Sequence, residues 1–321
     1  MHVPADMSLW NGRIDNDEGS DLLRLHQWVR AIDGECLGPG CALIGFACDE
    51  GVRRNQGRIG AALAPVAVRR ALSGTANHMI NPLYDAGDVV CLDGSLEAAQ
   101  EILAQQVTSL LQKKLTIVVL GGGHETAYGS YNGLRRHLDL VNPDSVLGII
   151  NFDAHFDLRS TASGAHSGTP FTQMAEACRL MGQPFRYACF GISRMANSGT
   201  LFERAESLGV SYLLDTELAS EGRKTMLSGA LRDFVAACDQ LYLSIDLDVL
   251  PAGIAPGVSA PAALGIPFDI LLFAVDVLRQ AVDTNGRPKL LLADICELNP
   301  HYDIDNRTAK VAARLCHHLF S

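Results

Sequence analysis

The chain has 321 residues, of which 48% are hydrophobic and 19% are charged, a composition typical of a soluble globular protein with a sizeable core. Its net charge of -10 argues against nucleic acid or an anionic membrane as a partner, because both require a dominant basic surface. No apolar run reaches the roughly 18 residues of a membrane span, and no signal-peptide pattern precedes residue 14. Nine scattered cysteines without a Cys-x-x-Cys pair indicate free thiols, so we expect a cytoplasmic protein.

Residues 1–40 predict an N-terminal covering segment with an acidic stretch and a helical pattern around Leu22 to Trp28. After it, short apolar runs alternate with longer amphipathic ones. The apolar runs predict strands at residues 41–47, 84–89, 115–120, 146–152, 186–191, 210–214, 241–247 and 290–295. The amphipathic runs predict helices at residues 65–72, 96–112, 125–138, 171–180, 197–208, 222–238, 267–282 and 306–319.

Strands that are apolar throughout and separated by helices are typical of a parallel sheet covered on both faces. We therefore predict an α/β fold with three layers, αβα, around a mostly parallel sheet of about eight strands. No linker, repeat or low-complexity segment divides the chain, so we expect residues 1–321 to form a single domain. Ligands of such sheets bind beyond the carboxyl ends of the strands. Chemically active residues should gather there.

Three ligand-type residues follow the strand predicted at residues 146–152: Asp153, His155 and Asp157. If the strand continues through them in extended form, all three side chains project from one face. Buried carboxylates are unfavourable unless they are paired or bound to a cation, which favours a metal site. A polar strand end exposed to water is the plainer alternative for this stretch alone.

Two further predicted strand ends carry similar residues. His124 follows three glycines after the strand at residues 115–120, and no Gly-Lys-Ser or Gly-Lys-Thr follows to suggest a phosphate loop. Asp246 and Asp248 stand two apart, on one face if the strand is extended, and would repel each other if buried without a partner. Taken alone, His124 is better explained as an incidental histidine in a turn. A solvated strand end is the alternative for Asp246 and Asp248, but the apolar residues on both sides weaken it.

Together the three strand ends offer two imidazoles and four carboxylates: His124, Asp153, His155, Asp157, Asp246 and Asp248. Six ligands suit two divalent cations better than one. Because most of the ligands are oxygens and no thiolate is offered, Mn²⁺ is favoured over Zn²⁺. A pair of such ions lowers the pKa of a shared water, so the predicted chemistry is hydrolysis.

Two more residues fall at the same predicted edge. Glu297 follows the last strand, where a carboxylate could bind an amidine or guanidine group through paired hydrogen bonds. His166 lies in a loop of small residues, where an imidazole could carry a proton to a leaving group. A surface glutamate and a solvated loop histidine are the alternatives.

With these motifs together, the chain resembles the ureohydrolase family of arginases and agmatinases from about residue 43 to the C-terminus. The motifs are Gly-Gly-Gly-His-Glu at 121–125, Asp-Ala-His-Phe-Asp at 153–157, Ser-Ile-Asp-Leu-Asp at 244–248 and Glu-Leu-Asn-Pro at 297–300. The resemblance implies one Mn²⁺ held by His124, Asp153, Asp157 and Asp246, and a second held by Asp153, His155, Asp246 and Asp248. It also implies that Glu297 binds the amidine nitrogen of a small-molecule substrate and that His166 is the proton shuttle. Trimers or hexamers are common in the family, so we expect a homo-oligomer.

Within the family, the chain is most similar to the branch that hydrolyses N-formimidoyl-L-glutamate to L-glutamate and formamide in histidine degradation. In that reaction we expect Asp248 and the metal pair to stabilise the tetrahedral intermediate. The substrate has two carboxylates, and Arg159 and Arg194 are placed to bind them, with Arg53, Arg54 and Arg58 as further candidates. A surface ion pair is the alternative for each arginine. Rival functions are a urea-releasing agmatinase or guanidinobutyrase, and a catalytically idle metal-bound scaffold.

Overall fold

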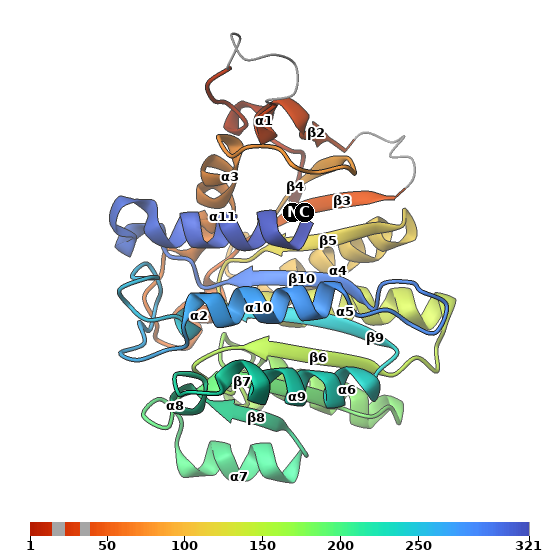
Figure 1. Ribbon diagram of the computed structural model, residues 1–321, viewed down its shortest axis with the longest axis vertical. Coiled ribbons are helices and arrows are strands. Elements are labelled where there is room, and N and C mark those ends of the chain that lie inside the picture. The colour runs from red at the N-terminus through yellow and green to blue at the C-terminus, as the bar shows by residue number, and fades with distance from the viewer. Residues whose placement is uncertain (15–22, 33–38, 321) are drawn as a thin grey trace.

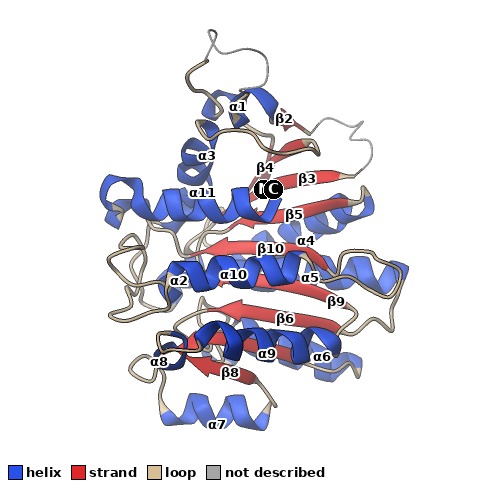
Figure 2. Ribbon diagram, in the orientation of Figure 1, coloured by secondary structure: helices blue, strands red, loops and turns tan. Residues whose placement is uncertain are grey.

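The computed structural model describes residues 1–14, 23–32 and 39–320, and it has the expected layers of helix, sheet and helix (Figures 1 and 2). The strands are β1 (His2–Val3), β2 (Arg30–Ala31), β3 (Gly40–Ala47), β4 (Leu83–Val90), β5 (Leu115–Leu120), β6 (Leu147–Phe152), β7 (Arg186–Ile192), β8 (Ser211–Leu214), β9 (Gln240–Asp246) and β10 (Leu290–Cys296). They form one sheet in the order β1-β4-β3-β5-β10-β9-β6-β7-β8, with β2 beside β4. Every pair is parallel except β1 with β4.

The helices are α1 (Leu25–Trp28), α2 (Glu50–Arg54), α3 (Ala64–Ser73), α4 (Leu96–Gln112), α5 (Thr126–Val141), α6 (Pro170–Met181), α7 (Gly199–Ser207), α8 (Asp215–Leu218), α9 (Arg223–Ala236), α10 (Phe268–Arg279) and α11 (Arg307–Phe320). In Figure 1, α9, α10 and α11 lie in front of the sheet, and α4, α5 and α6 lie behind it. Each layer encloses its own hydrophobic core against the sheet.

The apolar strands supply both cores because successive side chains point to opposite faces. In β6, Ile150 belongs to the core under α9, α10 and α11, whereas its neighbour Ile149 belongs to the core under α4, α5 and α6. Val118 and Ile117 of β5 divide in the same way. A continuously apolar strand therefore lies in the middle of three layers, as the sequence predicted.

The eight predicted strands and eight predicted helices are all present, within a few residues of their expected bounds. The sequence analysis missed β1 and β2, because two residues are too few to show a period. The expected extension of the strand through Asp153, His155 and Asp157 is wrong, since β6 ends at Phe152. Likewise β9 ends at Asp246, and Asp248 lies in the following 3-10 turn, Leu247–Val249.

The described parts of the N-terminal segment pack on the β4 side of the sheet, where β1 pairs with β4 and α1 contacts α3. Leu22 and the acidic residues 15–18 lie outside the described residues. All eight cysteines within the described ranges are free thiols, as predicted. Within the same ranges, no helix combines the length and the apolar character needed to cross a membrane.

Candidate metal centre and active site

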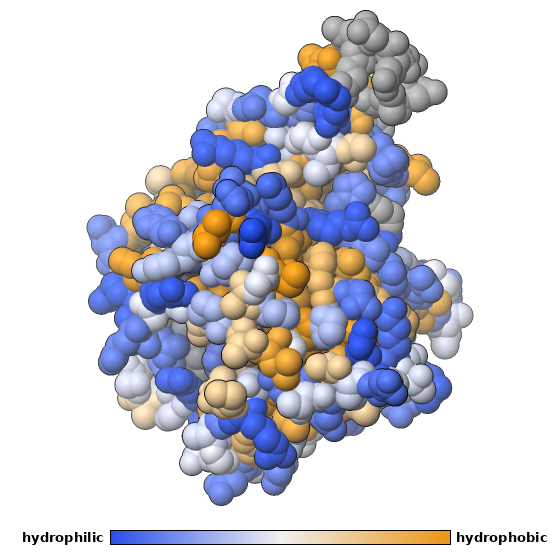
Figure 3. All heavy atoms as spheres, turned by 60° about the vertical axis from the view of Figure 1, so that its left-hand side comes forward, coloured by the Kyte–Doolittle hydropathy of each residue, from blue (hydrophilic) through white to orange (hydrophobic). Residues whose placement is uncertain are grey.

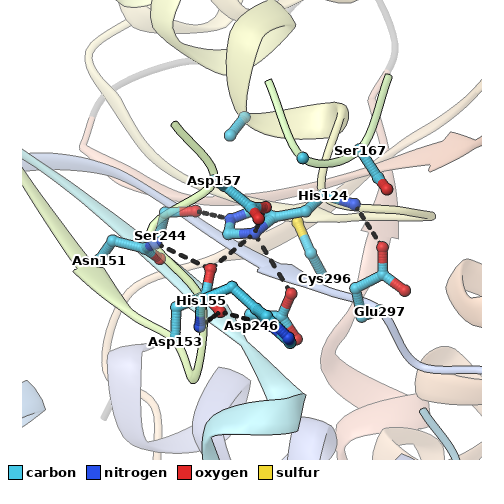
Figure 4. A network of polar contacts seen from close by, with 12 residues as sticks. His124, Asn151, Asp153, His155, Asp157, Ser167, Ser244, Asp246, Cys296 and Glu297 are labelled. Carbon is cyan, nitrogen blue, oxygen red and sulfur yellow. Dashed lines mark hydrogen bonds and ion pairs between the residues drawn. The ribbon is translucent and has the colours of Figure 1, made fainter. Parts of the chain in front are cut away.

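The predicted ligands come from strands that are neighbours in the middle of the sheet. The order β5-β10-β9-β6 brings the carboxyl ends of these four parallel strands to one edge. His124 follows β5, the aspartates at 153 and 157 follow β6, and Asp246 ends β9. Figure 4 shows their side chains converging on one point, with Glu297 from the end of β10 beside them.

The first group of ligands surrounds Nδ1 of His124. That nitrogen lies 3.1 Å from Oδ2 of Asp153, 3.0 Å from Oδ2 of Asp157 and 3.2 Å from Oδ2 of Asp246. One ligand atom from each of these four residues falls within a 4.8 Å cluster. This is the set that the resemblance implied for one metal ion.

The second group is formed by Asp153, His155 and Asp248. Nδ1 of His155 lies 3.0 Å from Oδ2 of Asp248 and 3.5 Å from Oδ1 of Asp153. Asp153 is therefore shared by the two groups, as expected of a bridging ligand. Asp246 clusters with the first group only, although the resemblance placed it in both.

Turns, rather than extended strand, bring these side chains together. Oδ1 of Asp153 accepts a hydrogen bond of 2.6 Å from the backbone N–H of His155, and Oδ1 of Asp246 accepts one of 2.8 Å from that of Asp248. Asp157 has a φ of 47°, in the left-handed region that aspartate tolerates better than most residues. The chain therefore folds back, and the Asp157 carboxylate points toward the His124 ring.

The hydrogen bonds of His124 leave Nδ1 free to bind a cation. Its Nε2 lies 2.9 Å from the hydroxyl of Ser244, which donates a hydrogen bond of 2.6 Å to Oδ1 of Asp294. Because the only hydroxyl hydrogen of Ser244 points at Asp294, Nε2 of His124 must donate and Nδ1 carries a lone pair. Tyr242 donates to the other oxygen of Asp294. The sequence analysis gave Ser244 no role and missed Asp294; the available signal was a single polar residue between apolar neighbours in each strand.

The excess of negative charge around His124 and His155 requires a cation. Burial raises the pKa of Asp246, and the nearby carboxylates of Asp248 and Asp153 raise it further. Burial opposes the imidazolium form of His124, yet the carboxylates of Asp153, Asp157 and Asp246, which would accept hydrogen bonds from a protonated Nδ1, outweigh that effect and raise its pKa. Within the described chain, no lysine or arginine forms an ion pair with any of the four carboxylates. Divalent metal ions fit this surplus of oxygen ligands.

Glu297 lies beside the metal ligands without belonging to either group. Its φ of 68° turns the carboxylate back toward the site, where Oε1 accepts a hydrogen bond of 2.8 Å from the backbone N–H of His124. Oε2 is buried and has no partner. Burial, together with the charge of Glu125, raises the pKa of Glu297 to about 8. An unsatisfied oxygen in this position is suited to accept a hydrogen bond from a bound molecule.

A cavity of about 290 Å³ opens above the ligands. Its walls include His155, Asp157, Asp246, Asp248 and Glu297 on the metal side. The remaining walls are formed by Asn55, Gln56, Gly57, Arg58, Arg159, Ser167, Ala196, Asn197, Leu201, Ser259 and Ala260. Figure 3 brings the carboxyl ends of the strands toward the viewer, and apolar residues gather in the middle of this face among polar ones.

Of the other predicted site residues, some line the cavity and some do not. His166 is buried and is not among the residues that line the cavity, although its neighbour Ser167 is; its Nδ1 accepts a hydrogen bond of 3.1 Å from the backbone N–H of Gly168. Burial lowers the pKa of His166, and the charges of Arg159 and Arg54 add to that effect. The imidazole is therefore neutral, with its hydrogen on Nε2.

Of the predicted arginines, Arg159 lines the cavity and Arg194 does not. Arg194 is exposed, and its guanidinium lies 5.3 Å from the ring centre of Phe202. Arg53 and Arg54 both form ion pairs with Glu50 and stay outside the cavity wall. Arg58, named only as a further candidate, is the second arginine of the wall.

Comparison with known proteins agrees with this geometry. The family model described as the arginase family matches residues 39–321, which is most of the chain. The chain therefore belongs to the arginase family.

Similar proteins include several formimidoylglutamases. Formimidoylglutamase of Aeromonas hydrophila is 52% identical over 320 residues, covering 98% of both chains, and that of Hahella chejuensis is 51% identical over 315 residues, covering 98% of this chain and 95% of the relative. Among solved structures, Trypanosoma cruzi formiminoglutamase with Mn²⁺ matches with a TM-score of 0.78 and 28% identity, covering 94% of this chain and 98% of that one.

Proposed function

We propose that this chain is a binuclear manganese hydrolase that converts N-formimidoyl-L-glutamate and water to L-glutamate and formamide. The observation that most supports this proposal is the pair of ligand groups that share Asp153. They lie at a cavity whose wall also includes two arginines without an ion-pair partner among the described residues. The names of the relatives support the same reaction, and with it we propose a role in histidine degradation.

His124, Asp153, Asp157 and Asp246 would hold one Mn²⁺, and Asp153, His155 and Asp248 would hold the other. When bound, the two ions supply an activated water nucleophile at neutral pH and stabilise developing negative charge. The protein contributes the positioning. Ser244 and Asp294 fix the orientation of His124, and the turns after β6 and β9 hold the carboxylates in place.

Glu297 would orient the formimidoyl head. Its partnerless Oε2 lies at the cavity, where it can accept a hydrogen bond from an amidine N–H. Because Oε1 is held by the backbone N–H of His124, the acceptor is fixed relative to the metal ligands.

His166 would deliver a proton to the departing nitrogen of glutamate. The ring is neutral at rest, so it must first take up a proton at Nδ1, in place of the hydrogen bond from Gly168, and the imidazolium can then give its Nε2 proton to the leaving nitrogen. Replacing His166 with Asn should lower turnover by about 10²- to 10⁴-fold, the usual contribution of a general acid, while Mn²⁺ is retained. A loss of metal from that variant would instead assign His166 a structural role.

Arg159 would bind one of the two substrate carboxylates. It is exposed, and its one side-chain hydrogen bond, to Oδ1 of Asn55, is long at 3.4 Å, so the guanidinium is available to a ligand. A cation at this position also disfavours agmatine, whose far end is positively charged. For the protein as a whole we further propose a single domain, a homo-oligomer and a cytoplasmic location.

A product assay tests the function directly. Mn²⁺-loaded protein is offered formimidoylglutamate, agmatine, guanidinobutyrate and arginine in parallel, and formamide, glutamate and urea are measured. Formamide and glutamate from the first substrate alone are expected. Urea from a guanidine substrate would overturn the substrate assignment, and no product from any of the four would favour an idle scaffold.

A further inference from the structure

We propose that Arg58 is the second carboxylate-binding residue of the cavity and that, together with Arg159, it makes the site selective for dicarboxylate amidines. This inference rests on the proposed function and names the residue that recognises the second acidic group. Arg58 and Arg159 are the only arginines or lysines of the described chain that line the cavity.

Arg58 is held by two other segments of the chain, residues 258–259 and 299–302. Its Nε donates a hydrogen bond of 2.9 Å to the carbonyl of Ser259, and Nη2 donates to the carbonyl of Val258. The guanidinium carbon lies 4.0 Å from the ring centre of Tyr302, a cation–π contact. The side-chain amide of Asn299 also donates to the Arg58 carbonyl over 2.9 Å. A guanidinium fixed in this way loses little further freedom when it binds an anion.

The contacts of Arg58 leave three of its guanidinium N–H groups available to a ligand. A guanidinium has five N–H groups, and two of them donate to the carbonyls of Ser259 and Val258. Both hydrogens of Nη1 and one of Nη2 remain, and no carboxylate of the described residues forms an ion pair with Arg58. The two terminal nitrogens together match the two oxygens of a carboxylate.

The nearby arginines at the end of α2 differ from Arg58 in this respect. Arg53 pairs with Glu50 at 2.6 Å, and Arg54 pairs with Glu97 at 2.5 Å, so their charges are already neutralised. Arg58 instead rests on neutral carbonyls and an aromatic ring beside Glu297 and the metal ligands. The cavity walls also include Leu201 and Ala260, which suit the methylene groups of a glutamate skeleton.

The test measures kcat/KM of wild type, Arg58→Gln and Arg159→Gln on three substrates. These are N-formimidoyl-L-glutamate, N-formimidoyl-4-aminobutyrate, which lacks the α-carboxylate, and N-formimidoyl-L-norvaline, which lacks the γ-carboxylate. Loss of a bidentate charged pair should lower kcat/KM on the dicarboxylate by about 10- to 100-fold. On one of the two analogues the effect of Arg58→Gln should shrink to within about twofold, and the effect of Arg159→Gln should shrink on the other.

Arg53→Gln is the matched control, because Arg53 lies five residues before Arg58 at the end of α2, is exposed and does not line the cavity. It should leave all three values unchanged, and Mn²⁺ content and unfolding temperature should confirm that each variant is folded. An equal loss on all three substrates, or no loss with Arg58→Gln, would overturn the inference.

Titration calorimetry with L-glutamate measures the same contact without turnover. Weaker glutamate binding by Arg58→Gln is expected. If wild type hydrolysed no formimidoylglutamate but Arg58→Gln still weakened glutamate binding, the proposed function would fail while the role of Arg58 stood. Unchanged glutamate binding would refute the role of Arg58 itself.

Discussion

Two buried clusters of charge in this molecule differ in how they are balanced. Near the N-terminal side, Arg69 donates to Asp85 over 2.7 Å and to Asp88 over 2.6 Å, and the indole of Trp10 donates to Asp85 over 2.7 Å. Each of these carboxylates therefore has a guanidinium partner. At the carboxyl edge, four aspartates meet around two imidazoles without any arginine or lysine.

The difference separates a structural role from a functional one. A buried ion pair with its hydrogen bonds satisfied holds segments together and needs no other molecule. Asp85 and Arg69 join α3, β4 and the segment that contains Trp10 in this way. A buried surplus of carboxylates is unfavourable unless a cation joins it, so its presence indicates a binding site. Four substitutions, from the largest expected effect to the smallest, test this contrast.

Asp153→Ala should have the largest effect, because Asp153 belongs to both ligand groups. We expect loss of both Mn²⁺ ions and of measurable hydrolysis, with folding preserved because a repulsive carboxylate is removed. Metal analysis after gel filtration and a formamide assay measure the two outcomes. Asp144→Ala, at an exposed position, is the control. A variant at Asp153 that kept two ions and full activity would contradict the assignment.

Arg69→Met should act on stability instead of metal binding. It leaves Asp85 and Asp88 without their guanidinium, so we expect a loss of about 3–5 kcal/mol in the free energy of unfolding. Chemical denaturation measures this loss, and Mn²⁺ content per folded protein should not change. Arg70→Met, at the adjacent exposed position, should change stability by no more than about 0.5 kcal/mol. Equal effects of the two substitutions would mean that the buried ion pair of Arg69 contributes no more to stability than an exposed arginine does.

Ser244→Ala should weaken the metal centre without removing a ligand. It takes away the acceptor that orients His124, and loss of such a supporting hydrogen bond lowers metal affinity by about 10- to 100-fold. Competition with a fluorescent chelator gives the Mn²⁺ affinity. Tyr242→Phe removes the other hydroxyl donor to Asp294 without touching His124 and should have a smaller effect. Wild-type affinity in Ser244→Ala would argue against the orienting role.

Trp10→Phe should have the smallest effect. It removes one hydrogen bond to Asp85 but leaves the guanidinium of Arg69 in place, so we expect a loss of about 1 kcal/mol. Thermal unfolding measures the change. Trp28→Phe is the comparison, because the Trp28 indole donates to an exposed backbone carbonyl and not to a buried carboxylate. A larger loss in Trp28→Phe would reverse the order proposed for the two tryptophans.

The sequence determined much of this protein because its signals are local. Apolar runs of five to seven residues between amphipathic stretches predicted the strands and the layered sheet, since the burial of both strand faces follows directly from composition. The six proposed ligands were predictable for a related reason: each lies at the carboxyl end of a strand or within five residues of it, and parallel strands end at one edge.

Only the tertiary structure decided which distant residues support that edge. The choice of Arg58 over Arg194 depends on the paths of loops from residues 55–60 and 257–260, which no local period encodes. The hydrogen bond from Ser244 to Asp294 forms because β9 and β10 are neighbouring strands, which brings two residues 50 positions apart side by side. The orientation of the Asp157 side chain depends on a turn that replaces the expected strand. Local patterns specify the elements and their ends, whereas contacts between remote segments are fixed only when the cores pack.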